Sequence, residues 1–530
     1  MTLLYLNSLF SISGIEPMEP SLLTLSNKSN LSQSDDLSVS SHVLNVKQID
    51  DNENSSSEYI DSKNCLSGHR IVDILFFIQQ IQVRHSGGMD CSFIDMQFQS
   101  EKIYGFHSVF NFKCKMCGIT SKIYSAENAQ QQCVPINKAI ISGCQAIGIG
   151  HTQMAEFAAF LEMPSLSCTG FVKLQSVVAN SIHESAWEEI RKAGEEEKRI
   201  ALECGSIDSD GIPMCTVIAD GQWSKRSYKT KYDALSGAVA IIGLKTQKIL
   251  FIGIKNKYCI ICQKSATKNE IAPKHECFMN WTKSSTSMEA DGVVEGFMNS
   301  ITMHGLKYNR LIGDGDSSVT KRLNDILPYG PHFFIKKIEC RNHLLRNYCS
   351  KISMLAKNTK YPLRVRKFVL INILRFRGDV TKSAKHWRNN NGLTMAQKIK
   401  GLRKDLDNCL YHRLGHHSNC AAYFCTGSKS NSAINLIPEA ENGGILREMK
   451  NCISRLVLNA ESLIENKTNN ICEQFNAIIN KHVAGKRLNF SGRRSYITRV
   501  EAAVISFNSN QFLRKIHKKM ANNNSPGRLG

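Results

Sequence analysis

Residues 215–223 read CTVIADGQW, an apolar run that reaches Asp220 and then turns polar. Two further β-rich runs follow, LSGAVAIIGL at 235–244 and KILFIGIKNKYC at 248–259, with a short lysine-containing turn between them. β-Branched residues bounded by turn residues indicate strands, and the spacing is typical of hairpins. We therefore predict a buried strand that ends at Asp220, in an antiparallel meander of three strands.

The residues after this meander predict a mixed α/β core. Helical spacing of apolar residues predicts a helix, and short apolar runs between turn residues predict strands. The expected elements are a helix at 290–305, a strand at 308–314, a helix at 318–327 ended by Pro328, a strand at 333–340 and a helix at 343–355. The order βββαβαβα favours a ribonuclease-H-like catalytic core, a mixed five-stranded sheet with helices.

Acidic residues follow two of the predicted strands. The stretch LIGDGDSS at 311–318 ends a strand on Asp314 and Asp316, which is also ordinary turn chemistry. In the predicted fold the first and fourth strands are neighbours, so Asp220 and Asp314 would face each other, and Glu473 in the first turn of a later helix would add a third acid. Carboxylates are the ligands that Mg²⁺ or Mn²⁺ prefers. We predict Asp220, Asp314 and Glu473 as catalytic metal ligands and leave Asp316 open between metal ligand and helix N-cap.

Other protein classes also place a D-x-D pattern after a strand. The haloacid dehalogenase pattern requires Thr or Val where Ser318 stands here, and no downstream lysine is clearly placed. Glycosyltransferases use D-x-D as well, but the excess basic charge does not suit them. Any single acid is more commonly a solvated side chain than a catalyst, so the prediction depends on the whole set.

Length and charge point to a multidomain protein with an anionic partner. The 530 residues are enough for two to four domains, and the net charge of +21 favours nucleic acid. No stretch reaches the ~18–20 uninterrupted apolar residues of a membrane span, so no membrane association is expected. The predicted organisation is a disordered leader at 1–67, a Cys/His-containing region with a connecting helix at 68–205, the first part of the core at 206–356 with a zinc-type insertion at 256–280, a helical insertion at 357–465, the return of the core with its catalytic helix at 466–500, and a basic tail at 501–530.

The 19 cysteines include several close Cys/His pairs, which favour a reducing compartment and bound metal over disulfides. The clearest set is Cys259, Cys262, His275 and Cys277, whose types and spacing suit a structural Zn²⁺ site. The alternative is a pair of buried thiols at a strand end.

Two other Cys/His groups are weaker metal candidates. Cys340 and His343 lie one helical turn apart, and His417 and Cys420, or Cys425, would complete a shared Zn²⁺ site with them. A packed cysteine and a hydrogen-bonded histidine are the alternative. Cys114 and Cys117 form a further pair before the core, for which His107, Cys133 or His151 are candidate partners in a DNA-binding zinc module. A turn with two free thiols remains the alternative there.

The motifs taken together resemble those of a known family. ADGQW, LIGDGDSS, CRNH followed by LLRN, and NNICEQFN occur in the order found in Mutator-like transposases, and HTQMAEFAAFLEMPSLS upstream also looks familial. This resemblance covers about half of the chain. It implies a DDE-type transposase with Asp220, Asp314 and Glu473 as the metal-binding triad, in which two Mg²⁺ ions would support cleavage at the transposon ends and then attack of the freed 3′-hydroxyl on target DNA. The long helical stretch before Glu473 fits the insertion domain of this group.

A basic segment follows the predicted catalytic helix. In GKRLNFSGRRSYITR at 485–499, basic side chains alternate with Phe490 and Tyr496, a pattern suited to phosphate contacts with some base stacking. A solvated basic surface is an equally good interpretation. The predicted DNA-binding residues are Lys486, Arg487, Arg493 and Arg494.

Three functions remain in competition. The first is a Mg²⁺-dependent transposase that acts on double-stranded DNA at its terminal repeats and at a target, in the nucleus, as a homo-oligomer assembled on DNA. The second is a domesticated, transposase-derived DNA-binding protein without transposition activity. The third is a ribonuclease-H-like nuclease that acts on RNA or hybrids. Retention of all three carboxylates favours the first, because a binding module has no need of them.

Overall fold

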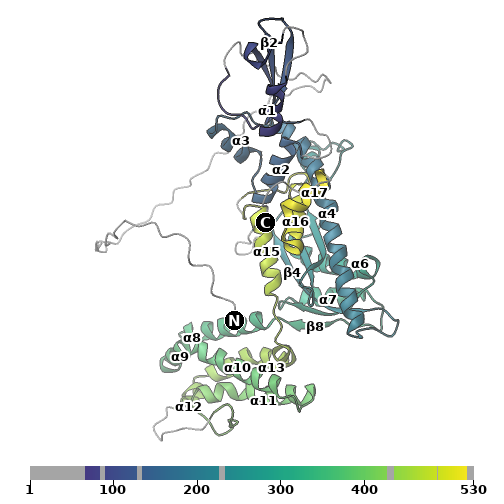
Figure 1. Ribbon diagram of the computed structural model, residues 1–530. Coiled ribbons are helices and arrows are strands. Elements are labelled where there is room, and N and C mark those ends of the chain that lie inside the picture. The colour runs from purple at the N-terminus through teal and green to yellow at the C-terminus, as the bar shows by residue number, and fades with distance from the viewer. Residues whose placement is uncertain are drawn as a thin grey trace, which may run out of the picture. The chain divides into compact units, whose positions relative to one another are not determined.

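The protein contains a five-stranded mixed sheet (Figure 1), as a computed structural model shows. The structure describes residues 66–83, 90–127, 134–225, 233–425, 435–485 and 488–521. The predicted leader at 1–67 therefore lies almost entirely outside the described residues. The strands are β4 (Met214–Trp223), β5 (Ser236–Gly243), β6 (Ile249–Asn256), β7 (Lys307–Gly313) and β8 (Lys336–Glu339).

The strand order is β6-β5-β4-β7-β8. β4, β5 and β6 pair antiparallel, as the hairpin spacing predicts, while β7 and β8 join β4 in parallel. Parallel pairing requires a crossover, and helices supply it between β6 and β7 and between β7 and β8. The predicted mixed five-stranded sheet is confirmed.

Strand β4 runs past Asp220 to Trp223, so the predicted strand end at Asp220 is wrong. Its antiparallel neighbour β5 continues to pair with it as far as Trp223 opposite Gly237. The parallel neighbour β7 pairs only as far as Ile218 opposite Ile312. Asp220 therefore lies just beyond the point where β4 loses its β7 partner.

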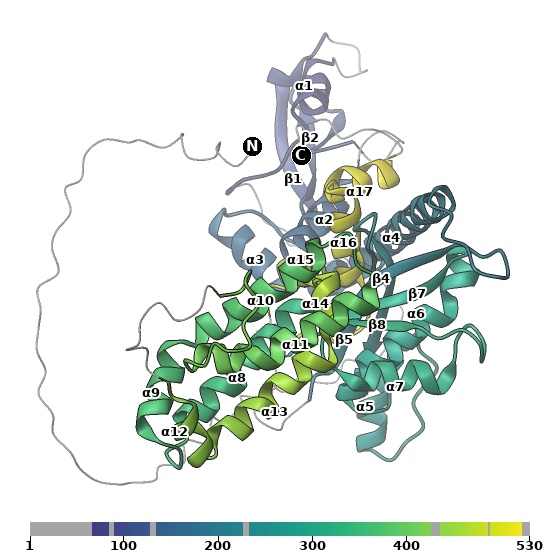
Figure 2. The same cartoon turned by 90° about the horizontal axis from the view of Figure 1, so that it is seen from below.

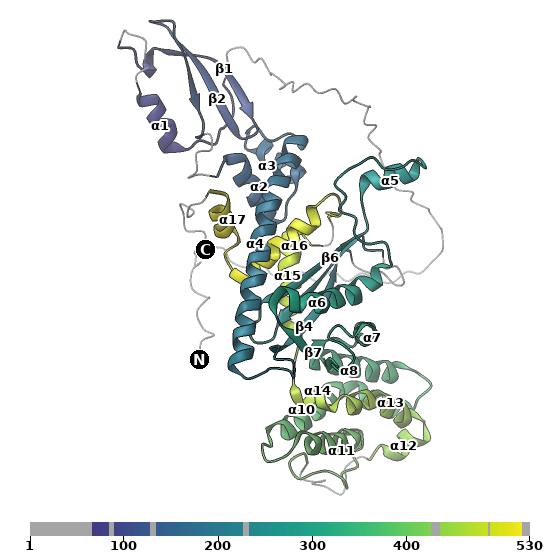
Figure 3. The same cartoon turned by 90° about the vertical axis from the view of Figure 1, so that its right-hand side faces the viewer.

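Helices cover both faces of this sheet (Figure 3). Side chains alternate along each strand, so each face of the sheet presents apolar residues against which helices pack. On β4, Ile218 packs into a core with α4 (Cys168–Glu203), α15 (Asn470–His482) and α16 (Ser495–Ser509). Val217 and Ala219 pack on the other side with α6 (Met288–His304) and α7 (Ser317–Ile326). Helix α4 is the connecting helix predicted within the region 68–205, and it begins at Cys168.

A second, helical core lies between β8 and α15 in sequence (Figure 2). Its buried cluster begins at Leu344 and ends at Ile464, so the helix predicted at 343–355 belongs to this bundle. The helices are α8 (Arg341–Lys357), α9 (Leu363–Ile371), α10 (Ile373–Asn389), α11 (Met395–Arg413), α12 (Ile437–Asn442), α13 (Ile445–Leu458) and α14 (Ala460–Glu465).

The elements before α4 include a three-stranded antiparallel sheet in the order β1-β2-β3. No helix among the described residues is long and apolar enough to cross a membrane. The remaining elements are α1 (Ile74–Gln82), η1 (Phe93–Asp95), β1 (Met96–Tyr104), β2 (His107–Cys114), β3 (Thr120–Tyr124), α2 (Ile136–Ile147), α3 (His151–Phe160), α5 (Ile260–Thr267), η2 (Ser285–Ser287) and α17 (Phe512–Ala521).

Candidate functional site

Asp220 and Asp314 occupy equivalent positions on neighbouring strands. Each follows by two residues a member of the parallel pair Ile218 and Ile312, so both lie at the same edge of the sheet. Asp220 Oδ1 accepts a hydrogen bond from the N–H of Gly221 at 3.0 Å. Asp314 Oδ1 accepts one from the N–H of Asp316, also at 3.0 Å. The two predicted acids are thus neighbours.

Helix α15 brings Glu473 to the same edge. Asn476 donates to Asp220 Oδ2 at 3.3 Å, and Asn480 accepts from the Gln222 amide at 2.9 Å. Residues 473, 476 and 480 share one helix face by their spacing, so the face that contacts β4 begins with Glu473. The Glu473 side chain is exposed.

The three acids interact electrostatically. Burial raises the pKa of Asp220, and the negative charges of Asp314 and Glu473 raise it further, to about 7. Hydrogen bonds from Gly221 and Asn476 oppose this increase. A carboxyl group crowded by two other carboxylates favours either a proton or a cation. The donor set consists of hard oxygen atoms, which fits Mg²⁺ or Mn²⁺.

Asp316 is the N-cap of α7. Its Oδ1 accepts from the N–H of Ser318 at 2.8 Å, and its Oδ2 accepts from the Ser318 hydroxyl, also at 2.8 Å. Two basic side chains donate hydrogen bonds to the backbone of the same turn. Lys337 donates to Asp316 O at 2.6 Å, and Arg455 donates to Gly315 O at 3.3 Å. Of the two roles left open for Asp316, metal ligand and helix N-cap, the structure shows the N-cap.

Glu289 is a fourth acid at this edge, and our sequence reasoning missed it. It lies in the first turn of α6 and approaches β4 from the face opposite to α15. A Cβ atom built on Gly221 would lie 3.0 Å from Glu289 Cδ, so the glycine leaves room for this carboxyl group. Burial, then the charges of Asp220 and Asp314, raise the pKa of Glu289 to about 8. The sequence did contain one signal: Glu289 lies four residues before the buried Val293, so it is on the same helix face as the apolar residues of α6.

The CRNH motif joins the start of α8 to the segment that leads into α15. The fully buried thiol of Cys340 donates to Asn469 Oδ1 at 3.1 Å. Because Asn469 is the N-cap residue of α15, this contact helps to fix where the Glu473 turn begins. Further hydrogen bonds join Arg341 N to Lys467 O at 3.0 Å, Arg341 Nη1 to Asn466 Oδ1 at 2.6 Å and Asn342 Nδ2 to Asn470 Oδ1 at 2.9 Å.

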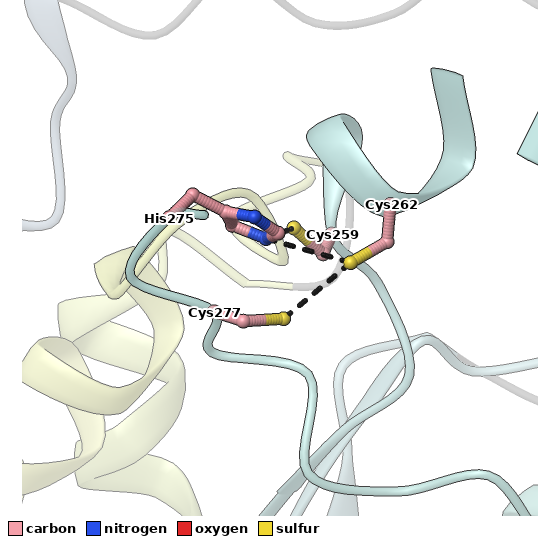
Figure 4. Close-up of side chains that lie close together, drawn as sticks. All are labelled: Cys259, Cys262, His275 and Cys277. Atoms are coloured by element: carbon pink, nitrogen blue, oxygen red, sulfur yellow. Dashed lines mark hydrogen bonds between the residues drawn. The ribbon is translucent and has the colours of Figure 1, made fainter. Parts of the chain in front are cut away.

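Cys259, Cys262, His275 and Cys277 converge on one point (Figure 4), as the sequence predicts. The sulfur atoms of Cys259 and Cys262 lie 3.3 and 3.4 Å from His275 Nε2, and those of Cys262 and Cys277 are 3.6 Å apart. Ligands of tetrahedral Zn²⁺ are about 3.5 Å apart for a nitrogen and a sulfur and about 3.8 Å for two sulfurs. These four residues could hold a structural zinc ion.

Two contacts of His275 and Cys259 suit metal binding. His275 Nδ1 donates to Pro273 O at 2.7 Å, which leaves the Nε2 lone pair toward the cysteines. Burial would raise the pKa of Cys259, but the backbone N–H groups of Cys262 and Ile261 and the His275 ring lower it to about 7. A thiol with a lowered pKa is readily deprotonated to the thiolate, which is the metal-binding form.

Replacing Cys262 with Ser is expected to remove one zinc ion per chain and to loosen the segment between β6 and α6. Cys262 is suited to this test because it contacts both His275 and Cys277. Metal content by elemental analysis and protease sensitivity of residues 257–280 would measure the effect. Cys204→Ser, at an exposed cysteine outside the cluster, is the control and should change neither quantity. Equal zinc content in both variants would contradict the assignment.

A family model described as Mutator-like transposase matches residues 68–425, most of the chain. The chain belongs to the Mutator-like transposase family. A search of curated proteins found no match. The family match begins just before the described N-terminal elements and ends at Cys425, so it includes Asp220, Asp314 and Glu289, whereas Glu473 lies beyond it.

The shared zinc site predicted between CRNH and the helical segment is not formed in this Mutator-like chain. His417 and Cys420 cluster instead with His412 and Cys425, within the helical segment itself. Cys340 faces Asn469, as described above, and neither it nor His343 belongs to any Cys/His cluster among the described residues. Both residues lie at the start of α8, but the one-turn spacing does not determine the direction of the thiol.

The N-terminal pair Cys114 and Cys117 clusters with Cys91, which our sequence analysis did not consider. Of the proposed partners, His107 instead contacts the Ser125 hydroxyl at 3.3 Å, and His151 contacts Leu166 O at 2.9 Å. Cys133 lies outside the described residues. Three cysteine sulfurs could hold a metal ion, but a closed tetrahedral site needs a fourth ligand.

The basic segment after α15 is described only in part, since Lys486 and Arg487 lie outside the described residues. Arg493 is exposed, while Arg494 donates to Asn180 Oδ1 at 2.6 Å. Both arginines line a hollow together with Cys259 and His275 of the Cys259 cluster. The two aromatic residues of this segment serve packing instead of the predicted stacking on bases: Tyr496 is buried, and the Phe490 ring lies 3.8 Å from the Arg499 guanidinium.

Proposed function

We propose that this Mutator-like chain is a DDE-type DNA transposase that cleaves DNA at transposon ends and transfers the strands into target DNA. Family membership supports transposase function in general. The observation that supports cleavage and strand transfer is the position of Asp220 and Asp314 on adjacent strands at one sheet edge, with Glu473 on the helix face that contacts β4 and close enough for its charge to raise the pKa of Asp220. The three acids come from β4, the end of β7 and α15, which are separate parts of the chain.

The sheet supports a ribonuclease-H-like core. Three antiparallel strands come first, and two parallel strands then extend the sheet beyond β4 in the order β6-β5-β4-β7-β8. This order makes the first and fourth strands of the core neighbours, as that fold requires. Helix α15 returns after the helical bundle and contacts β4 through Asn476 and Asn480. The bundle is then an insertion between β8 and the helix that carries Glu473.

Asp220, Asp314 and Glu473 would hold Mg²⁺ or Mn²⁺, and Glu289 adds a fourth carboxylate from the other side of β4. When bound, such ions supply charge stabilisation and an activated nucleophile for phosphoryl transfer. The residues of the chain orient these ligands. Asn476 hydrogen bonds one oxygen of Asp220, and the N–H of Asp316 fixes one oxygen of Asp314. The CRNH contact to Asn469 sets the start of α15 and so the position of Glu473.

The proposed partner is double-stranded DNA, both the terminal repeats and the target, and the proposed location is the nucleus. The net charge of +21 favours a polyanion. Exposed Arg493 beside the Cys259 zinc cluster offers a phosphate contact close in sequence to the Glu473 helix. Assembly as a homo-oligomer on DNA would allow both transposon ends to be cut together.

Replacing Arg493 with Gln is expected to weaken DNA binding by about threefold to tenfold. A lost phosphate contact also lowers the slope of log affinity against log salt by about 1. Fluorescence anisotropy with a DNA duplex at several salt concentrations would measure both. Arg199→Gln is the matched control, because Arg199 is a surface residue of α4 that pairs with Glu203. If the two variants bind alike at every salt concentration, Arg493 does not contact DNA.

The proposal as a whole is tested by incubating the purified protein with the element's own terminal repeats and a target duplex. Mg²⁺-dependent cleavage and strand transfer are expected for the wild type and absent for Asp220→Ala. The main alternative is a transposase-derived DNA-binding protein without transposition activity. Equal inactivity of the wild type and Asp220→Ala, with tight DNA binding in both, would favour that alternative. Cleavage of RNA or hybrid substrates only would instead indicate a nuclease.

A further inference from the structure

The helical bundle contains a Cys/His cluster that our sequence analysis did not assemble. Helix α11 ends at Arg413, and the chain from His416 to Cys425 then has no regular helix or strand. His412 lies in the last turn of α11, and the next three members follow within a few residues. In sequence the cluster is His-x4-His-x2-Cys-x4-Cys, formed by His412, His417, Cys420 and Cys425.

The four ligand atoms lie within 4.8 Å of one another. The Nδ1 atoms of His412 and His417 are 3.1 Å apart. Cys420 Sγ lies 3.4 Å from His412 Nδ1 and 3.9 Å from His417 Nδ1, and Cys425 Sγ lies 3.4 Å from His417 Nδ1. In tetrahedral Zn²⁺ sites two nitrogens are about 3.3 Å apart, and a nitrogen and a sulfur about 3.5 Å. The cluster therefore has the size of a zinc coordination shell.

The surroundings are consistent with thiolate and neutral imidazole ligands. The Asn408 amide donates to Cys420 Sγ at 3.5 Å, so the sulfur acts as an acceptor. All four side chains are half-buried, which limits their contact with water. Without a metal, two facing Nδ1 atoms can share only one hydrogen, and at most one hydrogen bond joins them. A bound cation satisfies both lone pairs at once.

We propose that His412, His417, Cys420 and Cys425 bind one structural Zn²⁺ ion in a closed tetrahedral site. Two nitrogens and two sulfurs fill the coordination shell, so no position remains for substrate. The site lies in the helical bundle, separate from both the acidic edge and the Cys259 cluster. It would hold the segment 416–425 against the end of α11.

The segment held in this way presents one aromatic side chain at a basic surface. The Tyr423 ring stacks on His386 of α10 at 3.5 Å between ring centroids, with nearly parallel planes. Tyr423 also donates to Asp405 of α11, and Lys382 donates to Phe424 O at 2.9 Å. Tyr423, His386 and Lys382 line one hollow. Loss of the metal is expected to release Tyr423 from this position.

The first test compares the zinc content of purified full-length variants. Cys420→Ser is expected to contain one zinc ion per chain less than the wild type. Cys452→Ser is the matched control, because Cys452 is a half-buried cysteine of the same bundle outside the cluster. It should retain the wild-type content. Equal zinc content in Cys420→Ser and the wild type would overturn the proposal.

The second test needs no variant and remains decisive if Cys420→Ser does not fold. Native wild-type protein is treated with iodoacetamide, with and without a zinc chelator, and peptide masses report the alkylation of each cysteine. Cys420 and Cys425 are expected to react at least about tenfold faster after chelation, whereas Cys349 and Cys452 should react at unchanged rates. Chelator-independent alkylation of Cys420 and Cys425 would exclude a bound metal at this site.

Discussion

Asp314→Asn is expected to lower DNA cleavage by about 10³-fold or more, while Asp316→Asn retains most of the activity. Asp314 lies beside Asp220 at the sheet edge, and the neutral amide of Asn lacks the negative charge and the second ligand oxygen by which a carboxylate binds and bridges hard divalent cations. Asp316 instead caps α7, and Asn is as good an N-cap residue as Asp. Only one glycine separates the two acids in the sequence, but we assign them different roles: Asp314 is a metal ligand and Asp316 is a helix cap.

The measurement is single-turnover cleavage of a terminal-repeat duplex at saturating Mg²⁺, with DNA binding measured in parallel. Both variants should bind DNA as the wild type does, so that a loss of cleavage reports chemistry. Asp316→Ala is a further control. It should remain active but unfold with about 1 kcal/mol less free energy, because the cap is lost. If Asp316→Asn were inactive and Asp314→Asn active, the assignment within DGD would be reversed.

The elements of the sheet were predictable because their patterns are local. Buried strands such as 235–244 consist almost entirely of apolar residues, and the parallel crossovers follow from helices between strands. The end of β4 was not predictable in this way. It depends on how far β5 continues to pair, and pairing is a property of two strands that no single segment reveals.

Parts of the site depend on side-chain direction, which sequence spacing does not determine. Cys340 and His343 have metal-ligand spacing, yet the thiol faces Asn469 and completes the start of α15. His412 was not considered as a ligand because it lies inside a helix, before the HHSNC stretch, whereas Cys425 was considered only as part of a site shared with Cys340 and His343. Cys259, Cys262, His275 and Cys277 were predictable because a short loop can close only in a few ways.

Glu289 shows a second limit of sequence reasoning. An acid in the first turn of a helix is ordinary, because it interacts favourably with the helix dipole. Its significance comes from Gly221, which lacks a side chain where the Glu289 carboxyl group packs, and from Asp220 beside that glycine. These residues are far apart in the sequence, and only the contact of α6 with β4 brings them together.

Glu289→Gln is expected to stabilise the metal-free protein at pH 8 and to weaken its response to Mg²⁺. The pKa values of Asp220 and Glu289 are raised to about 7 and about 8 in the folded protein, from ordinary values of 3.8 and 4.5. Between about pH 4 and pH 8, these two carboxyl groups therefore still hold protons in the folded state that they have released in the unfolded state. The contribution of these groups to stability is therefore greatest below about pH 4 and is lost as the pH rises to about 8.

The size of the effect follows from the same shifts. A tenfold change in an acid dissociation constant corresponds to about 1.4 kcal/mol, and removal of one charge from the coupled pair should recover roughly 1–3 kcal/mol at pH 8. Thermal unfolding in EDTA from pH 4 to pH 9 would measure it. The wild type should lose stability across this range more steeply than Glu289→Gln. Mg²⁺ added at pH 8 should raise the melting temperature of the wild type more than that of the variant, because a cation binds the folded acid cluster selectively.

Glu295→Gln is the matched control on the same helix. Glu295 pairs with Lys255 at 2.5 Å and is partly exposed, so its removal should change the free energy of unfolding by less than about 1 kcal/mol and leave the pH slope unchanged. Superimposable pH profiles for the wild type and Glu289→Gln in EDTA would show that the pKa of Glu289 is not raised in the folded protein. A steep wild-type profile that Mg²⁺ flattens would instead mean that the acids at this edge are crowded in the absence of metal, as expected of ligands arranged for a divalent cation.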